Sequence, residues 1–180
     1  MRVITGSARG RKLKTPAGYD VRPTTDNVKE SIFNIIQFDI EGRNVLDLFA
    51  GTGQLGIEAL SRGAAKAVFV DSSMESLKTV KENLSVCGMK AQTVKTDALS
   101  FLNSGCGKFD IIFIDPPYDS DIYEKVLKNI NLFDILSNGG IIIVECRRER
   151  QLPEMEKPYY KNREYNYGKI KIVSYMKELL

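Results

Sequence analysis

Two short stretches of the chain hold residues whose types and spacing could carry out chemistry. In the first, Gly51, Gly53 and Gly56 form a G-x-G-x-x-G motif directly after an apolar segment that predicts a strand. In the second, Asp115-Pro116-Pro117-Tyr118 follows the continuously apolar residues 111–114. A glycine turn after a strand is typical of a nucleoside-cofactor site, and a rigid polar corner suits an exocyclic amino group. Together they predict the transfer of a group between two bound molecules.

The carboxylates around the glycine motif make it more specific. Asp71 lies at the end of the next predicted strand, where it could accept hydrogen bonds from both hydroxyls of a ribose. The motif with Asp71 fits NAD, FAD or S-adenosylmethionine. Asp47, four residues before the first glycine, would repel a pyrophosphate but attract the ammonium or sulfonium group of S-adenosylmethionine. Asp47 therefore favours S-adenosylmethionine, and the flanking strand and helix pattern disfavours a turn that binds nothing.

A further carboxylate, Asp97, has two interpretations. It follows the third predicted strand, where the adenine of the cofactor should lie, and could accept a hydrogen bond from the 6-amino group. Alternatively, it caps a helix that begins at Ala98. The sequence leaves both interpretations open.

The second stretch suits the activation of an aromatic amine. Such an amine is conjugated with its ring and is a poor nucleophile, so a catalyst helps by accepting hydrogen bonds from its N–H groups. The Asp115 carboxylate and the Pro116 carbonyl could do this, while Pro116 and Pro117 fix the backbone. Tyr118 could stack on a base that is flipped out. The alternative is a Pro-Pro turn that merely ends a strand.

The elements that must position these residues alternate between strand and helix. The predicted strands are residues 45–49, 67–70, 91–95, 110–114 and 141–144, with an edge or antiparallel strand at 169–175. A first helix is predicted after Thr25 or Asp26, either of which could cap it. Further helices are predicted over residues 53–62, 74–86, 98–102 and 122–130. This alternation predicts an α/β fold with a doubly wound, mostly parallel sheet. We expect a single domain over residues 1–180, with a basic N-terminal hairpin extension at 1–22 and a catalytic core at 23–180.

Composition excludes several classes of protein. The 180 residues contain no histidine, which excludes Ser-His-Asp and His-Cys catalysis. The three cysteines lack metal-ligand spacing, so we expect no metal and a reducing, cytoplasmic location. No apolar run approaches the length of a membrane helix, and the first residues show no signal pattern.

The net charge of +3 is small, but the basic residues gather at the two ends of the sequence. Residues 1–22 contain six basic residues and one acidic residue, and residues 147–171 contain eight basic and four acidic residues. Basic ends on a nearly balanced middle indicate a phosphate-rich partner. The alternative is two solvated, lysine-rich ends.

The two stretches together resemble class I S-adenosylmethionine-dependent methyltransferases that act on amino nitrogens. Three further segments make the chain similar to the bacterial 16S ribosomal RNA guanine-N2 methyltransferases, a Rossmann-like family that modifies a loop guanine of the small subunit. These are Gly6-x-x-Arg9-Gly10-Arg11-Lys12-Leu13, Arg22-Pro23-Thr24-Thr25-Asp26 with the residues up to Asn34, and residues 55–64. The chain departs from the family at Gln54, at Asp71 and near Tyr167-Gly168, which lacks the usual threonine.

The resemblance implies the roles of particular residues. It implies a seven-stranded sheet with an antiparallel last strand and a target guanine at Asp115, Pro116, Pro117 and Tyr118. It implies that S-adenosylmethionine binds to Asp47, Phe49, Gly51, Gly53, Gly56, Asp71, Asp97, Arg22, Thr24 and Thr25. It also implies that Arg9, Arg11, Lys12 and Lys14 contact RNA. The expected partner is 16S ribosomal RNA in a partly or fully assembled small subunit, bound by a monomer without a metal or a membrane.

Other functions stay open at this point. A DNA adenine or cytosine methyltransferase could share the Asp-Pro-Pro-Tyr corner, although it would ordinarily carry an inserted recognition region. A protein glutamine methyltransferase usually has Asn in place of Asp115 and needs no basic ends. A dinucleotide-dependent oxidoreductase conflicts with Asp47, and a non-catalytic RNA-binding module leaves the glycine motif unexplained.

Overall fold

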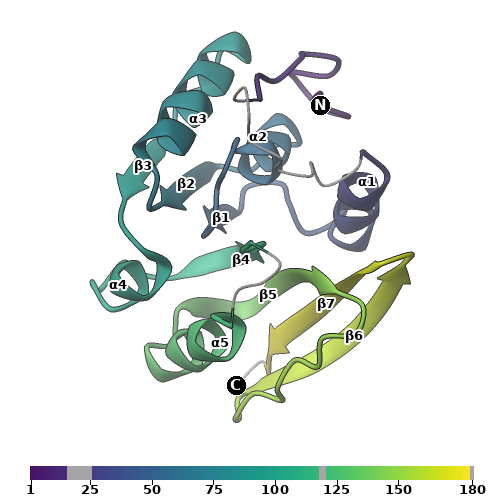
Figure 1. Ribbon diagram of the computed structural model, residues 1–180, viewed down its shortest axis with the longest axis vertical. Helices are drawn as coiled ribbons and strands as arrows, with labels where there is room; N and C mark the ends of the chain where they lie inside the picture. The colour runs from purple at the N-terminus through teal and green to yellow at the C-terminus, as the bar shows by residue number, and fades with distance from the viewer. Residues whose placement is uncertain (16–25, 118–120, 179–180) are drawn as a thin grey trace.

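The computed structural model describes residues 1–15, 26–117 and 121–178 (Figure 1). In chain order its elements are α1 (Asp26–Ile35), β1 (Asn44–Asp47), α2 (Gln54–Ser61), β2 (Lys66–Asp71), α3 (Met74–Val86), β3 (Gln92–Lys95), α4 (Ala98–Leu102), β4 (Phe109–Ile114), α5 (Tyr123–Leu132), β5 (Leu136–Arg147), β6 (Tyr159–Tyr167) and β7 (Ile170–Lys177). Helices and strands alternate as far as β5. The α/β prediction is confirmed.

The strands form one seven-stranded sheet in the order β3-β2-β1-β4-β5-β7-β6. The pairs from β3 through to β5 are parallel, whereas β7 runs antiparallel to both β5 and β6. The expected antiparallel last strand is therefore confirmed. The chain builds outward from β1 to β3 and then returns to place β4 on the other side of β1. In open α/β sheets, ligands bind at the carboxyl ends of the strands beside such a switch point.

Helices cover both faces of the sheet, as Figure 1 shows. Alternate residues of the strands point to opposite faces, so Val45 and Phe69 belong to one buried cluster and Leu46 and Val70 to the other. The first cluster contains apolar residues of α1, α2 and α3, and the second contains those of α4 and α5. This double burial explains why residues 45–46 of β1 and residues 111–114 of β4 are apolar without interruption.

The hairpin extension was predicted over residues 1–22; a hairpin is present within residues 1–15, and residues 16–22 lie outside the described residues. Arg2 and Lys12 form an antiparallel bridge, and the amide of Leu13 donates to the carbonyl of Met1 at 3.1 Å. The hairpin does not stand away from the rest of the chain, because its buried residues Val3 and Leu13 join the cluster of α1, α2 and α3.

The second half of the sheet differs from the sequence prediction. β5 extends well beyond the apolar residues 141–144 at both ends. β6 was not predicted, because Tyr159 is its only fully buried residue and its sequence is polar. β7 is antiparallel as expected but is not an edge strand, because β6 pairs along its outer side.

Candidate functional site

Four carboxylates lie at the carboxyl ends of four neighbouring strands. Asp97 follows β3, Asp71 ends β2, Asp47 ends β1 and Asp115 follows β4, and these strands are adjacent in the sheet. The register aligns Asp71 with Lys95, two residues before Asp97. It likewise aligns Asp47 with Phe113, two residues before Asp115. Residues predicted separately to bind a cofactor and an amine therefore share one edge of the sheet.

The glycine motif forms a tight turn between β1 and α2. Gly51 and Gly53 have φ angles of 52° and 77°, which residues with a side chain rarely adopt. The amide of Gly53 donates to the carbonyl of Ala50 at 2.6 Å, which closes the turn. A Cβ atom on Gly51 would meet nothing within 4 Å, so a ligand can approach the backbone there.

Asp47 is held beneath this turn. Its side chain is only 2% exposed, and its Oδ2 accepts a hydrogen bond from the amide of Gly56 at 3.0 Å. Burial raises the pKa of Asp47 to about 7, although the Gly56 hydrogen bond opposes the rise, and the charge of Asp71 adds to it. The site thus contains a carboxylate that is costly to ionise without a positive partner.

The next two carboxylates organise loops. Asp71 accepts hydrogen bonds from the amides of Gly51 at 2.9 Å and Ser73 at 2.8 Å, so it links the glycine turn to the start of α3. Asp97 caps α4 by accepting from the amide of Ser100 at 2.9 Å, and hydrogen bonding from the side chain and the amide of Ser100 lowers the pKa of Asp97. The capping interpretation of Asp97 is therefore confirmed, and its contact with adenine stays a prediction.

At the end of β4, Asp115 is half-buried, Pro116 is buried and Pro117 is exposed. Tyr123 of α5 lies close by: its buried hydroxyl donates to the carbonyl of Glu145 at 3.2 Å. Burial raises the pKa of Tyr123, and the nearby charge of Asp115 acts in the same direction. The guanidinium of Arg150 lies 4.9 Å from the centre of the Tyr123 ring. Tyr123 and Arg150 were not predicted as site residues.

Some predicted residues fall outside the described residues, namely Arg22, Thr24, Thr25 and Tyr118. Phe49 is half-buried and comes directly before the glycine turn. The four basic residues predicted to bind RNA, Arg9, Arg11, Lys12 and Lys14, are all exposed on the hairpin. The ammonium of Lys14 also forms an ion pair with Glu82 of α3 at 3.0 Å.

The structure adds buried polar residues that sequence reasoning missed. Glu58 and Asn83 are fully buried on α2 and α3, and Lys29 is fully buried on α1. Burial lowers the pKa of Lys29, while the charge of Glu58 opposes this effect. For Asn83 the sequence did indicate burial. It lies three residues after Val80 and next to Leu84, on the apolar face of its helix.

Gln54 is a further residue of this kind. It is the first residue of α2, directly after the glycine turn, and is 8% exposed. Its buried Oε1 has no hydrogen-bond partner within the described part of the chain. A buried acceptor without a donor is rare in folded proteins and calls for an explanation, such as an ordered water, an ion or a functional role.

One cavity, the possible metal ligands and the possible membrane helices were compared with the predicted site. A cavity of about 350 Å³ lies between β2, β3 and α4, and none of its lining residues was predicted to be in the site. Over residues 1–15, 26–117 and 121–178, no group of His, Cys, Asp and Glu side chains could hold a metal ion. Within the same ranges, no helix is long and apolar enough to cross a membrane.

Comparison with known proteins agrees with this geometry. The family described as Conserved hypothetical protein 95 matches residues 1–176, a span that includes the hairpin, the glycine turn and the Asp115 corner. The chain belongs to this family. Because the match spans residues 1–176, we expect members of this family to resemble the chain along nearly its whole length.

Two relatives and one solved structure illustrate that likeness. "Putative rRNA methyltransferase YlbH" of Bacillus subtilis is 43% identical over 182 residues, which cover 98% of this chain and 99% of that protein. "Ribosomal RNA small subunit methyltransferase D" of Escherichia coli is 34% identical over 179 residues, which cover 99% of this chain and 90% of that protein. The solved structure of "Putative methyltransferase yhhF from Escherichia coli" superposes with a TM-score of 0.90 at 34% identity. The superposition covers 100% of this chain and 99% of that chain.

Proposed function

We propose that this chain is an S-adenosylmethionine-dependent methyltransferase that methylates the exocyclic N2 amine of a guanine in small-subunit ribosomal RNA. The observation that carries the proposal is that Asp115 and Pro116 directly follow β4, which pairs with β1, the strand that ends at Asp47 and leads into the glycine turn. An amine-binding corner and a cofactor turn on adjacent strands bring two reactants together. The names of the relatives, which are ribosomal RNA methyltransferases, support the same reaction and substrate.

The residues at the carboxyl edge fit S-adenosylmethionine. The space beside Gly51 admits a ligand to the backbone, and Asp71, which accepts from the Gly51 amide, is the residue that we assign to the ribose. Buried Asp47 gains from a positive group, and the unpaired oxygen of Gln54 gains from an N–H donor. The ammonium end of the cofactor offers both. When bound, S-adenosylmethionine supplies an electrophilic methyl group on a sulfonium.

The protein's own part in the reaction is to hold and aim the amine. Asp115 and the carbonyl of Pro116 accept hydrogen bonds from its two N–H groups, which directs the nitrogen lone pair toward the methyl carbon. The amine nitrogen would form a bond to the methyl carbon as the carbon–sulfur bond breaks and S-adenosylhomocysteine leaves. The amine would also lose one proton, for which the Asp115 carboxylate is the acceptor that we assign. Because both reactants are held in place, positioning supplies much of the rate enhancement.

The basic hairpin is the RNA-binding part of the proposal. Arg9, Arg11, Lys12 and Lys14 are exposed and positively charged, so their contacts with phosphates would give affinity without reading sequence. The target base would be read at the Asp115 corner. We propose a monomer that acts in the cytoplasm on a partly or fully assembled small subunit.

Methyl transfer from labelled S-adenosylmethionine tests the proposal directly. Small ribosomal subunits, deproteinised ribosomal RNA, DNA and a protein extract are offered separately, and the labelled RNA is then digested and mapped by mass spectrometry. We expect label in a single guanine of small-subunit RNA, as N2-methylguanine. Label in DNA, in protein amide or in another RNA would instead support an amino-methyltransferase with a different substrate. No label in any of them would contradict the assigned reaction.

A further inference from the structure

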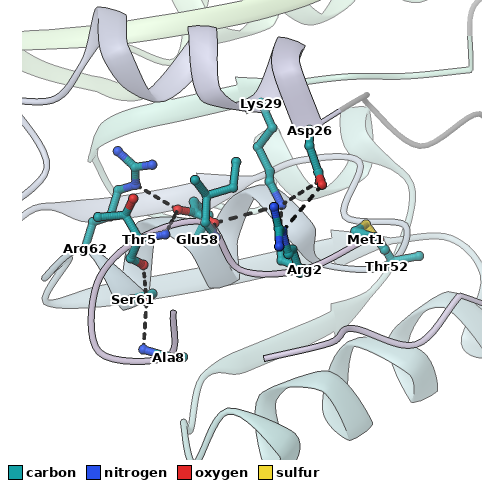
Figure 2. Close-up of polar contacts among 11 residues, drawn as sticks. Met1, Arg2, Thr5, Ala8, Asp26, Lys29, Thr52, Glu58, Ser61 and Arg62 are labelled. Atoms are coloured by element: carbon teal, nitrogen blue, oxygen red, sulfur yellow. Dashed lines mark hydrogen bonds and ion pairs between the residues drawn. The ribbon is translucent and has the colours of Figure 1, made fainter. Parts of the chain in front are cut away.

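The first strand of the hairpin is fastened to α2. The carboxylate of Glu58 accepts hydrogen bonds from the amides of Ile4 at 2.7 Å and Thr5 at 3.0 Å. The hydroxyl of Ser61 donates to the carbonyl of Thr5 at 2.6 Å and accepts from the amide of Ala8 at 3.0 Å (Figure 2). These contacts involve backbone groups, so they fix the path of the hairpin whatever side chains it carries.

The same strand is also joined to α1. The ammonium of Lys29 donates to the carbonyl of Arg2 and lies 3.9 Å from the carboxylate of Glu58 (Figure 2). Arg62 completes the group by donating to Glu58 at 2.8 Å. Because Lys29 and Glu58 are fully buried, the anchor is shielded from water and salt.

The second strand is held by one residue of α3. The Oδ1 of Asn83 accepts from the amide of Lys14 at 2.7 Å, and its Nδ2 donates to the carbonyl of Lys14 at 3.1 Å. The same Nδ2 donates to the carbonyl of Thr52 at 2.9 Å. Thr52 lies between Gly51 and Gly53. A single buried amide therefore joins the basic hairpin to the cofactor turn.

Thr52 touches the first strand as well. Its hydroxyl lies 3.6 Å from the sulfur of Met1 in a weak hydrogen bond (Figure 2). The amide of Leu13 donates to the carbonyl of Met1, which closes the hairpin at this point. Both strands of the hairpin thus meet the middle residue of the glycine turn, one of them through Asn83.

We propose that Asn83 is a positioning residue that couples RNA binding at the hairpin to cofactor binding at the glycine turn, so that each ligand tightens the binding of the other. The inference rests on the proposed function. A cofactor that contacts the backbone at Gly51 restricts the motion of the Thr52 peptide. Because the Asn83 amide is hydrogen-bonded to both Thr52 and Lys14, the backbone of Lys14 becomes more restricted as well. A ligand that meets an already ordered segment loses less entropy on binding, and linkage makes the effect reciprocal.

Calorimetry on the full chain measures the coupling. The probe is S-adenosylhomocysteine, which cannot donate a methyl group, titrated with and without an in vitro transcript of small-subunit ribosomal RNA. For the wild type we expect RNA to tighten cofactor binding about fivefold or more. We call the affinity for S-adenosylhomocysteine with RNA divided by that without RNA the coupling ratio. In Asn83→Ala this ratio falls to near one. Glu82→Gln is the matched control, because it removes the Lys14 ion pair on the same helix and leaves the Asn83 bridge in place; it keeps the wild-type ratio.

A second measurement needs no variant, in case Asn83→Ala fails to fold. Hydrogen exchange of the Lys14 amide is followed by NMR in the wild type, with and without S-adenosylhomocysteine. We expect slower exchange when the cofactor is bound, although Lys14 is not in the cofactor site. Exchange that does not change would overturn the coupling, as would a wild-type ratio of one or an Asn83→Ala ratio equal to that of the wild type. Failure of the wild type to bind either probe would instead contradict the proposed function.

Discussion

The carboxylate of Asp47 lies against the backbone of Gly56, with 3.0 Å between its Oδ2 and the amide nitrogen. This contact requires glycine. A Cβ atom at position 56 would come within 2.4 Å of the Phe69 ring and 3.2 Å of the Asp47 carboxylate. The third glycine of the motif therefore lets α2 pack closely on the sheet and seals Asp47 from water. The raised pKa of Asp47 follows from that packing.

The stability of the free protein should fall as the pH rises from about 4 to about 7. In this window the folded state keeps a proton on Asp47, whose pKa is raised to about 7, whereas the unfolded state has lost it near 3.8. The unfolded state then binds fewer protons, so the free energy of unfolding decreases with pH and levels off above about 7. Urea titrations over pH 4–8 measure this contribution as the difference between wild type and Asp47→Asn, in which it is absent.

The affinity for S-adenosylhomocysteine should change in the opposite direction. Its ammonium group favours ionised Asp47, so affinity rises by up to about tenfold per pH unit as the pH approaches about 7 from below. Asp47→Asn should bind more weakly at pH 7 and lose this dependence between pH 5.5 and 7. If calorimetry found the same slope in Asp47→Asn, another group would have to be its source.

Asp115→Ala should abolish methyl transfer to RNA and leave cofactor affinity within about twofold of the wild type. The reason is that Asp115 follows β4, on the amine side of the edge, while the glycine turn follows β1. Single-turnover transfer and calorimetry separate the two effects. Asp39→Ala is the control, because Asp39 is exposed in the loop between α1 and β1, at the amino end of β1. Wild-type turnover in Asp115→Ala would show that Asp115 is not catalytic.

The order of elements was predictable wherever burial leaves a strong periodic pattern. β4 is buried on both faces, so residues 111–114 are continuously apolar, and the predicted strand 110–114 missed only its first residue, Phe109. β6 gave no such pattern because one face is solvated and its partner β7 supplies the apolar residues. Pairing between distant strands is a tertiary property that local sequence does not record.

The candidate site was predictable to a similar extent. Acidic residues at strand ends are visible in the sequence, and the sheet order then brings Asp47, Asp71, Asp97 and Asp115 to one edge. Glu58 and Asn83 were not identified, because their importance lies in backbone partners more than 30 residues away along the chain. Such contacts depend on how the hairpin folds back over α2 and α3.

Removing the basic side chains of the hairpin should weaken RNA binding and its dependence on salt. Arg9→Gln, Arg11→Gln and Lys12→Gln combined should lower the slope of log affinity against log salt by about 2 to 3, since each phosphate contact contributes about 0.7 to 0.9. Filter binding at several salt concentrations gives the slope. Lys125→Gln with Lys128→Gln on α5, at the opposite end of the molecule in Figure 1, should leave it unchanged. Equal slopes for both sets of variants would argue against the hairpin as the RNA-binding surface.

Glu58→Gln should destabilise the fold and weaken RNA binding more than cofactor binding. The change removes the charge that faces Lys29 and Arg62 and leaves two buried partners poorly compensated. Breaking a buried ion pair costs about 3 kcal/mol or more of unfolding free energy. Chemical denaturation measures the loss, with Glu30→Gln as the control because Glu30 is exposed on α1. Loss of cofactor affinity as large as the loss of RNA affinity would contradict a role confined to the hairpin.

Gln54 allows the fit of the cofactor to be tested through stability. Its buried Oε1 has no partner among the residues described, so Gln54→Met replaces an unpaired acceptor by an apolar group of similar size. We expect the free energy of unfolding without cofactor to rise by about 1 kcal/mol, because an unpaired buried acceptor costs about 1–3 kcal/mol. We expect cofactor affinity to fall at the same time, because the oxygen that would accept from the ammonium is gone. Thermal unfolding and calorimetry with S-adenosylhomocysteine measure the two changes.

The two changes in Gln54→Met have opposite signs, and this distinguishes a binding role from a packing defect. If Gln54 were only a poorly packed residue, the substitution would raise stability and leave affinity unchanged or improved. If its oxygen meets the cofactor, the gain in stability comes with a loss of affinity. Gln37→Met, at an exposed position after α1, should change neither quantity. A gain in stability with unchanged affinity would therefore remove Gln54 from the cofactor site and leave Asp47 as the residue that attracts the ammonium group.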